Sequence, residues 1–137
     1  MITGIAHVAL TVSSMKRSID FYTRALGFTR AFDLLDDKGN IKLTYLRVGR
    51  SQFIEIFPGD PTLVVKSRTG HVCFEVDDLP ATVEAMRAQG VEILVEPKMG
   101  RDGCRQAWIA DPDGYRIELM QIMPNSLQAK AIERSNE

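Results

Sequence analysis

The two halves of the chain carry the same order of expected elements, and this internal repeat limits the possible folds more than any other sequence feature. A shift of 64 residues aligns His7 with His71, and a shift of 63 residues aligns Glu55 with Glu118. The one-residue difference falls in the loop after the first helix, where an insertion or deletion is easily tolerated. Each half has the pattern of a β-α-β-β-β unit, so the sequence predicts two paired modules in an α+β fold.

Module one covers residues 4–58 and changes between strand-like and helical patterns. Its expected elements are a strand at 5–12, a helix at 14–28, a turn at 34–40, and strands at 41–49 and 51–57. Ser13 or Ser14 can cap the helix, because a hydroxyl oxygen accepts hydrogen bonds from the free amide groups of the first turn. Gly27 is placed to end the same helix.

Module two covers residues 70–122 and repeats this order. Its expected elements are a strand at 70–76, a helix at 77–90, a strand at 91–97, a loop at 100–105 and a hairpin at 106–122. Asp78 has the chemistry of a helix N-cap, and the run Asp111-Pro112-Asp113-Gly114 predicts the turn of the hairpin. Residues 124–137 form a polar tail, in which we expect one or two helical turns.

The composition excludes several classes of function. The chain has 137 residues, enough for one domain with a sizeable core, and we expect residues 1–137 to form a single domain. Its net charge is −1 without a basic block, so nucleic-acid binding is not expected. No apolar run approaches the ~20 residues of a membrane-spanning helix, and the N-terminus lacks a signal-peptide pattern. Cys73 and Cys104 cannot make a disulfide framework, so we expect a cytoplasmic protein.

The segment SQFIEIF (51–57) places Glu55 among large apolar residues of a strand whose pattern indicates burial on both faces. A buried carboxylate costs several kcal/mol unless a partner compensates its charge. His7 and His71 are the only histidines, and the repeat pairs them as it pairs Glu55 with Glu118. Two imidazoles and two carboxylates suit a divalent metal such as Ni²⁺, Zn²⁺, Co²⁺, Mn²⁺ or Fe²⁺. The sequence thus predicts a metal site with these four ligands.

Structural roles for the same residues remain open. A single histidine in a strand is more often structural than a metal ligand, and a buried glutamate can pair with an arginine. Arg116 leaves the same face of its strand as Glu118 and is an obvious partner for it. Two histidines and two glutamates that obey one symmetry are harder to explain by unrelated structural roles, which favours the metal site.

Strand alternation predicts which side chains share a face with the four ligands. These neighbours are Ala9 and Thr11 beside His7, Phe53 and Phe57 beside Glu55, Cys73 and Glu75 beside His71, and Arg116 and Met120 beside Glu118. The candidate substrate-binding residues among them are Thr11, Phe53, Phe57, Cys73, Arg116 and Met120. We interpret Cys73 as a small buried filler, because no histidine is left to activate it as a nucleophile. Tyr45 and Trp108, which the repeat also aligns, are expected in the core.

Four segments carry a family resemblance. They are GIAHVALTV (4–12), SIDFYTRALGF (18–28), GHVCFEVDD (70–78) and DPDGYRIELMQ (111–121). These segments resemble the opening strands, the first helix and the final hairpin of the glyoxalase, bleomycin-resistance and extradiol-dioxygenase group, the vicinal oxygen chelate superfamily. The resemblance covers residues 4–122 and implies one domain of this type, in which both modules curl a mixed sheet into a cup around a metal.

The His-Glu-His-Glu set is similar to that of bacterial glyoxalase I. This similarity implies a metal-dependent lyase or isomerase that moves a proton through an enediolate, with the metal as Lewis acid and a ligand carboxylate as base. Glu118 is the first choice for the base, with Glu55 on the opposite side, and the two roles can be exchanged. The similarity further implies Ni²⁺ or Zn²⁺ as the favoured metal and a homodimer with equivalent sites that combine modules from two chains.

Two positions depart from the glyoxalase I pattern. Such enzymes carry an arginine near the end of the first strand and an asparagine after the first metal glutamate, where this chain has Thr11 and Pro58-Gly59-Asp60. The glutathione-containing substrate of those enzymes is therefore one option among several. The alternatives are a metal-dependent epimerase or isomerase of a sugar or acyl thioester, an extradiol-type dioxygenase, and a metal-free antibiotic-binding resistance protein. A fourth protein ligand disfavours the dioxygenase, and a complete ligand set disfavours the metal-free protein.

Overall fold

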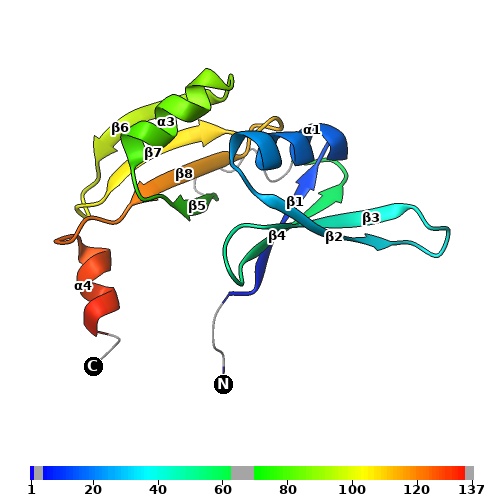
Figure 1. Cartoon of the computed structure of the whole chain (residues 1–137), viewed down its shortest axis with the longest axis horizontal. Helices are drawn as coiled ribbons and strands as arrows, with labels where there is room; N and C mark the ends of the chain where they lie inside the picture. Colours follow the sequence, from blue (N-terminus) through cyan, green and yellow to red (C-terminus); the bar gives the residue numbers. More distant parts are fainter. Residues whose placement is uncertain (2–4, 63–69, 135–137) are drawn as a thin grey trace. The chain divides into compact units, whose positions relative to one another are not determined.

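Two compact units, Met1–Ser67 and Arg68–Glu137, make up the chain in the computed structural model, which describes residues 1, 5–62 and 70–134. Each unit contains one four-stranded sheet with helical structure on one face (Figure 1). Both sheets are mixed, because one strand pair in each is parallel and the other pairs are antiparallel. The predicted α+β class with two mixed sheets is confirmed.

The sheet of unit one has the strand order β1-β4-β3-β2. Its strands are β1 (His7–Val12), β2 (Thr29–Leu35), β3 (Ile41–Arg47) and β4 (Phe53–Pro58). β1 runs parallel to β4, and β3 is antiparallel to both of its neighbours. The first and last strands of the unit are therefore adjacent, which brings together residues that lie far apart in the sequence.

One helix and a π-helical segment contribute the rest of the core of unit one. α1 (Met15–Asp20) is capped by Ser14, whose hydroxyl accepts a hydrogen bond from the Arg17 amide at 3.3 Å. The predicted helix continues through η1 (Phe21–Ala25) in π-helical geometry, and Gly27 follows with φ +74°, which glycine adopts without steric cost. The largest fully buried side chains of this unit are Tyr22, Leu46, Ile54, Ile56 and Val12.

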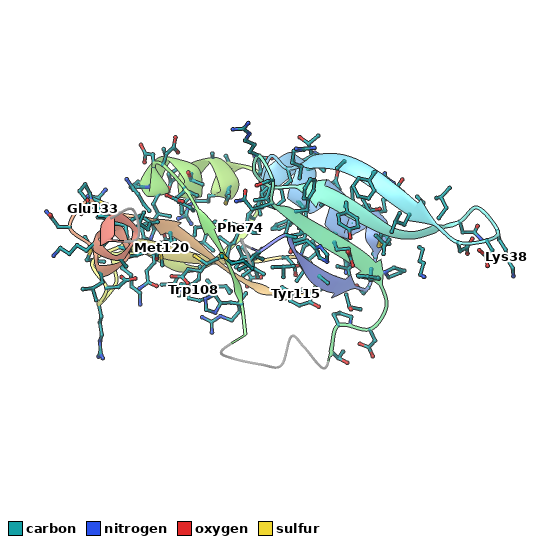
Figure 2. All side chains as sticks on the ribbon, turned by 90° about the horizontal axis from the view of Figure 1, so that it is seen from below. Lys38, Phe74, Trp108, Tyr115, Met120 and Glu133 are labelled. Atoms are coloured by element: carbon teal, nitrogen blue, oxygen red, sulfur yellow. The ribbon has the colours of Figure 1, made fainter. Side chains whose placement is uncertain are left out.

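β2 occupies residues for which the sequence patterns predict no complete element. Its pairing with β3 contains two register shifts, and the consecutive Leu34 and Leu35 are both exposed. A strand of this kind lacks the alternation that identifies strands in a sequence. The expected turn forms at its end, where Asp36 accepts hydrogen bonds from the amides of Lys38 and Asn40, both at 2.9 Å. Lys38 lies at the tip of this hairpin (Figure 2).

The sheet of unit two has the strand order β5-β8-β7-β6 and repeats the pairing of unit one. Its strands are β5 (Val72–Glu75), β6 (Glu92–Met99), β7 (Arg105–Ala110) and β8 (Arg116–Gln121). β5 is parallel to β8, and β7 is antiparallel to both of its neighbours. β6 continues beyond Pro97, where the sequence pattern predicts its end.

α3 (Leu79–Ala88) packs against β6, β7 and β8 (Figure 1). Asp78 is its N-cap, as predicted, and accepts a hydrogen bond from the Ala81 amide at 3.1 Å. Gly90, with φ +78°, ends the helical region. The buried face of the helix consists of Leu79, Val83 and Met86. The helix therefore packs on the face of β8 opposite to the face that carries Glu118.

The turn between β7 and β8 is the one that the sequence predicts. Asp111 is 5% exposed, and its carboxylate accepts hydrogen bonds from the amides of Asp113 and Tyr115, both at 2.9 Å. Gly114 adopts φ +87° in the same turn. Because β8 begins directly after Tyr115, this turn sets the position of the strand that carries Glu118.

The tail contains one further helix, α4 (Leu127–Arg134). It begins against the loop before β7, where the Leu127 amide donates to the Asp102 carbonyl at 2.8 Å. Gly103 approaches this junction so closely that an added Cβ would lie 3.3 Å from the Ser126 Cα. Among the helices of the described segments, none is long and apolar enough to cross a membrane.

Candidate metal centre

Unit one places a histidine beside a buried glutamate. The parallel register of β1 and β4 pairs the Cα atom of Ala9 with that of Glu55, so His7 and Glu55 leave the same face of the sheet. His7 Nε2 lies 3.2 Å from Glu55 Oε2. Glu55 is only 8% exposed, whereas the His7 side chain is 41% exposed. The pair therefore combines a buried oxygen donor with a nitrogen donor that solvent can reach.

Unit two repeats this arrangement with the same atoms. His71 directly precedes β5, and its Nε2 lies 3.1 Å from Glu118 Oε2 on β8. Glu118 is 7% exposed, and the His71 side chain is 34% exposed. The repeat seen in the sequence is thus a repeat of side-chain geometry.

These two pairs fit the donor set of a divalent cation. Two ligands that bind one cation at about 2.1 Å and at a right angle lie about 3.0 Å apart, close to the observed 3.2 and 3.1 Å. The same separations also suit a direct hydrogen bond from a protonated Nε2. Within either unit, the described residues contain no group of three or more His, Cys, Asp or Glu side chains suited to a metal. Each unit accordingly holds two of the four predicted ligands.

Arg116 is not the partner of Glu118. None of the ion pairs among the described residues joins these two side chains, and the glutamate contacts His71 instead. The Arg116 Cζ atom lies over the Trp108 ring, 4.8 Å from its centroid. The alternative in which Arg116 forms an ion pair with Glu118 is therefore wrong.

Tyr45 contacts both members of the pair in unit one. It is the cross-strand partner of Glu55 on β3, and the nearby Glu55 carboxylate raises the pKa of the Tyr45 hydroxyl. Its ring meets the His7 ring edge-on, with centroids 5.5 Å apart, and stacks on Phe32 at 4.5 Å. Tyr45 is thus placed to orient both the carboxylate and the imidazole.

Trp108 takes the corresponding place in unit two, on β7 (Figure 2). It is the cross-strand partner of Glu118, and its ring centroid lies 4.7 Å from that of His71. The expectation that Tyr45 and Trp108 pack in the core is wrong, because both are half-buried on the face of the histidines and glutamates. The available signal was the repeat itself, which aligns the two aromatic residues with each other on strands next to the glutamates.

Cys73 lies beside Glu118, its Cα partner across β5 and β8. Partial burial of the thiol, followed by the negative charge of the neighbouring Glu118, raises the pKa of Cys73 to about 12. The residue is exposed as a whole, so the predicted buried position is wrong. A thiol with this pKa is a poor nucleophile at neutral pH, which agrees with the expectation that it does not act as one.

In each unit, the histidine and the glutamate leave one face of the sheet, which we call the ligand face. The six candidate substrate-binding residues all lie on the ligand faces of the two sheets. Unit one contains Thr11, Phe53 and Phe57, and unit two contains Cys73, Arg116 and Met120. Thr11 and Phe57 are Cα partners, and Phe53 meets Tyr45 edge-on with centroids 6.2 Å apart. Apart from Cys73, these side chains are half-buried. They provide apolar surface next to both pairs, with one cationic group.

The chain belongs to the Glyoxalase/Bleomycin resistance protein/Dioxygenase superfamily, whose family model matches residues 4–119. A probable lactoylglutathione lyase of Vibrio cholerae is 31% identical over 123 residues, which cover 85% of this chain and 89% of the relative. The lactoylglutathione lyase of Pseudomonas aeruginosa is 30% identical over 147 residues, covering 87% and 82%. TnmS3, an antibiotic-binding protein from Streptomyces sp. CB03234, has the same fold, with a TM-score of 0.73 and 24% identity over 89% of this chain and 98% of TnmS3.

Proposed function

We propose that this protein is a divalent-metal-dependent lyase or isomerase of the glyoxalase type, which moves a proton between adjacent carbons of a hydroxycarbonyl compound. One observation carries the proposal. The same Nε2–Oε2 contact occurs at 3.2 Å in unit one and at 3.1 Å in unit two. Unrelated structural contacts have no reason to recur at equivalent positions with identical atoms. Lactoylglutathione lyase, the name of the relatives at about 30% identity, supports the same type of reaction.

The proposed ligands of the metal are His7, Glu55, His71 and Glu118. Ni²⁺ or Zn²⁺ is favoured, and Co²⁺, Mn²⁺ and Fe²⁺ suit the same donors. A bound cation supplies Lewis-acid polarisation of the substrate carbonyl. Both glutamates are more than nine-tenths buried, and a cation compensates two charges whose burial would otherwise cost several kcal/mol each.

Glu118 is the proposed base, and the unequal surroundings of the two glutamates support this choice. Glu55 has the Tyr45 hydroxyl as a neighbour, whose pKa it raises, whereas the equivalent Trp108 offers no hydroxyl to Glu118. A carboxylate with fewer fixed partners turns more easily toward a substrate carbon. In this assignment Glu118 takes the proton from one carbon and returns it to the neighbouring carbon. Glu55 acts from the opposite side of the substrate.

The walls of the proposed substrate site are the side chains on the ligand faces of both sheets. They are Thr11, Phe53, Phe57, Cys73, Arg116 and Met120. Apolar walls with few polar groups are typical of small-molecule sites, where the polar groups determine orientation. Glutathione conjugates and other acyl or sugar hydroxycarbonyls are the classes of substrate to compare.

We further propose a cytoplasmic homodimer, in which residues 1–137 form one domain and module one (4–58) of one chain combines with module two (70–122) of the other. Two variants test this assembly. The His7→Ala/Glu55→Ala variant lacks the ligands of module one, and the His71→Ala/Glu118→Ala variant lacks those of module two. Neither variant alone should bind metal. Mixed dimers of the two variants should regain one complete site, whereas sites formed within a single chain would regain none.

Loading of the metal-free protein with single divalent metals tests the proposed function. Metal-free protein is loaded in turn with Ni²⁺, Zn²⁺, Co²⁺, Mn²⁺ or Fe²⁺, and bound metal is measured before activity. Turnover of the hemithioacetal of glutathione and methylglyoxal would support the lactoylglutathione lyase reaction. Solvent-deuterium incorporation into other hydroxycarbonyls, without hemithioacetal turnover, would support an epimerase or isomerase. Failure to bind any of these metals would contradict the proposal.

A binding function without turnover is the second candidate, and the aromatic surface of unit one favours it. Phe32 is 48% exposed and stacks on Tyr45 at 4.5 Å, and Phe53 lies edge-on to the same ring. Such a surface suits a flat aromatic compound, including antibiotics of the kind that the name of TnmS3 indicates. Tight binding of a planar aromatic compound by metal-free protein, with no exchange of substrate protons after metal loading, would favour this candidate.

A further inference from the structure

Arg116 stands next to the His71–Glu118 pair without belonging to it. Arg116 and Glu118 are two residues apart on β8, so their side chains leave the same face about 7 Å apart along the strand. Since a guanidinium is protonated at every physiological pH, this face of unit two carries a permanent positive charge beside the proposed base.

The guanidinium of Arg116 lies over the Trp108 ring. The Arg116 Cζ atom lies 4.8 Å from the centroid of the Trp108 ring, and the same ring meets His71 at 4.7 Å. Stacking on an aromatic ring holds the guanidinium plane but uses none of its N–H groups. The donors of Arg116 therefore remain available in a fixed orientation.

The buried donor of Arg116 has no acceptor in the described part of the chain. Its Nε is buried and makes no hydrogen bond, although nearly all buried polar groups in proteins have a partner. The neighbouring carboxylates are engaged elsewhere, Glu118 with His71 and Asp111 with the amides of its own turn. The vacant donor thus points to an acceptor from outside the chain. Nε and an adjacent Nη form a planar pair of donors that matches the two oxygens of a carboxylate.

In the described part of unit one, the arginine on the corresponding face already uses a guanidinium donor. The repeat aligns Arg116 with Phe53, and the arginine nearest to that ring, Arg47, uses its Nη1 to bind the Arg50 carbonyl at 3.0 Å. Arg47 thus places a cation on this face of unit one as well, but among the described residues the buried guanidinium donor without an acceptor belongs to Arg116 in unit two. An asymmetric substrate with one anionic end matches this difference.

We propose that Arg116, stacked on Trp108, binds a carboxylate of the substrate. The substrate class is then an acidic hydroxycarbonyl compound, in which the carboxylate is a few bonds away from the carbons that exchange the proton. The assignment of this group to a substrate rests on the proposed function, whereas the carboxylate-binding site itself does not depend on a metal.

Trp108 is the only tryptophan of the chain, so its fluorescence reports directly on this site. Metal-free protein is titrated with glycolate, and in parallel with glycolamide, which has the same hydroxyl group but no charge. Glycolate should change the Trp108 emission in a saturable way, and glycolamide should not. Arg116→Gln should raise the dissociation constant for glycolate at least tenfold. Arg116→Lys should raise it at least threefold, because an ammonium cannot offer two coplanar donors.

The matched control is Arg105→Gln, which removes an exposed arginine from β7 and should leave the dissociation constant within twofold of wild type. Circular dichroism establishes whether each variant is folded. If Arg116→Gln does not fold, the comparison of Arg116→Lys with wild type still tests the proposal. Equal responses to glycolate and glycolamide, or unchanged binding in the folded Arg116 variants, would overturn the proposal. So would a response to inorganic phosphate with none to glycolate. If the proposed function is wrong but the carboxylate site is right, the result differs. Metal-loaded protein would then exchange no substrate proton, whereas metal-free protein would still bind glycolate.

Discussion

Tyr45 is the direct cross-strand partner of Glu55, and the buried carboxylate raises the pKa of the Tyr45 hydroxyl. The ring of the same tyrosine meets the His7 ring at 5.5 Å. One residue thus contacts both proposed metal ligands of unit one. Groups that orient a ligand in this way typically change metal affinity by 10–100-fold when removed.

The Tyr45→Phe substitution removes the hydroxyl and keeps the ring. We expect the affinity for Zn²⁺ to fall by about 10-fold or more, because the Glu55 carboxylate loses the polar group placed to orient it. Competition with a chromophoric chelator measures this change. Trp108→Phe is the control, since it alters the equivalent aromatic residue without removing a hydroxyl. A Tyr45→Phe effect no larger than that of Trp108→Phe would contradict an orienting role of the hydroxyl.

Asp111 stabilises the turn that leads into β8. We expect Asp111→Ala to lower the free energy of unfolding by about 1–3 kcal/mol, because two amides lose their acceptor at a buried position. Asp36→Ala removes the same type of acceptor from the exposed hairpin of unit one and should have a clearly smaller effect. Urea unfolding followed by circular dichroism compares the two, and equal losses would show that burial of the turn is not the cause.

Local chemistry explains how much of this fold the sequence predicts. The cap at Asp78, the turn at Asp111 and the strand around Glu55 follow from rules that act over a few residues, and the structure contains all three. β2 could not be predicted, because Leu34 and Leu35 are consecutive, exposed and close to a register shift. Only pairing with β3, a contact between distant residues, defines that strand.

The pH dependence of stability should include a contribution from Asp33. Burial acts to raise the pKa of this carboxyl, but hydrogen bonds from Arg30 and Thr44 and the charge of Arg30 outweigh it, so the pKa is lowered from 3.8. A lowered pKa means that the folded state favours the ionised form. The stabilisation is therefore complete above pH ~4 and is lost as the pH falls through the lower folded-state pKa.

Asp33→Asn removes this contribution. The difference in urea midpoint between wild type and Asp33→Asn should be largest near pH 6 and should shrink as the pH is lowered to about 2. The difference in urea midpoint between wild type and Arg30→Gln should shrink over the same pH range. Arg30→Gln removes the positive charge that lies 2.7 Å from the Asp33 carboxylate. A difference in urea midpoint between wild type and Asp33→Asn that stays constant from pH 6 to pH 2 would argue against a lowered pKa of Asp33.

Cys73 should react slowly in the metal-free protein. With a pKa of about 12, only about one thiol in ten thousand is ionised at pH 8. Alkylation by iodoacetamide, located by mass spectrometry, should be at least ~100-fold slower than that of a small free thiol with pKa ≈ 8.5. Glu118→Gln should accelerate it, because the negative charge beside the thiol is removed. Fast alkylation of wild-type Cys73 would instead mark this residue as a candidate nucleophile.

The candidate site was predictable in its residues but not in its surroundings. The repeat identifies two histidines and two glutamates, and the structure pairs them as His7 with Glu55 and His71 with Glu118. Alternation along a strand gives two faces but does not say which face lies on the core. For this reason Tyr45, which contacts His7 on the ligand face, was expected among the core residues.

Metal content tests the central claim most directly. Wild type and the single variants His7→Ala, Glu55→Gln, His71→Ala and Glu118→Gln are loaded with Zn²⁺, dialysed and analysed by mass spectrometry for metal per chain. Glu75→Gln is the control, a carboxylate of the same sheet outside both pairs. The account predicts about one Zn²⁺ per chain in wild type and control, and at least tenfold weaker retention in each of the four variants. Wild type that retains no metal, or ligand variants that retain as much as the control, would contradict it.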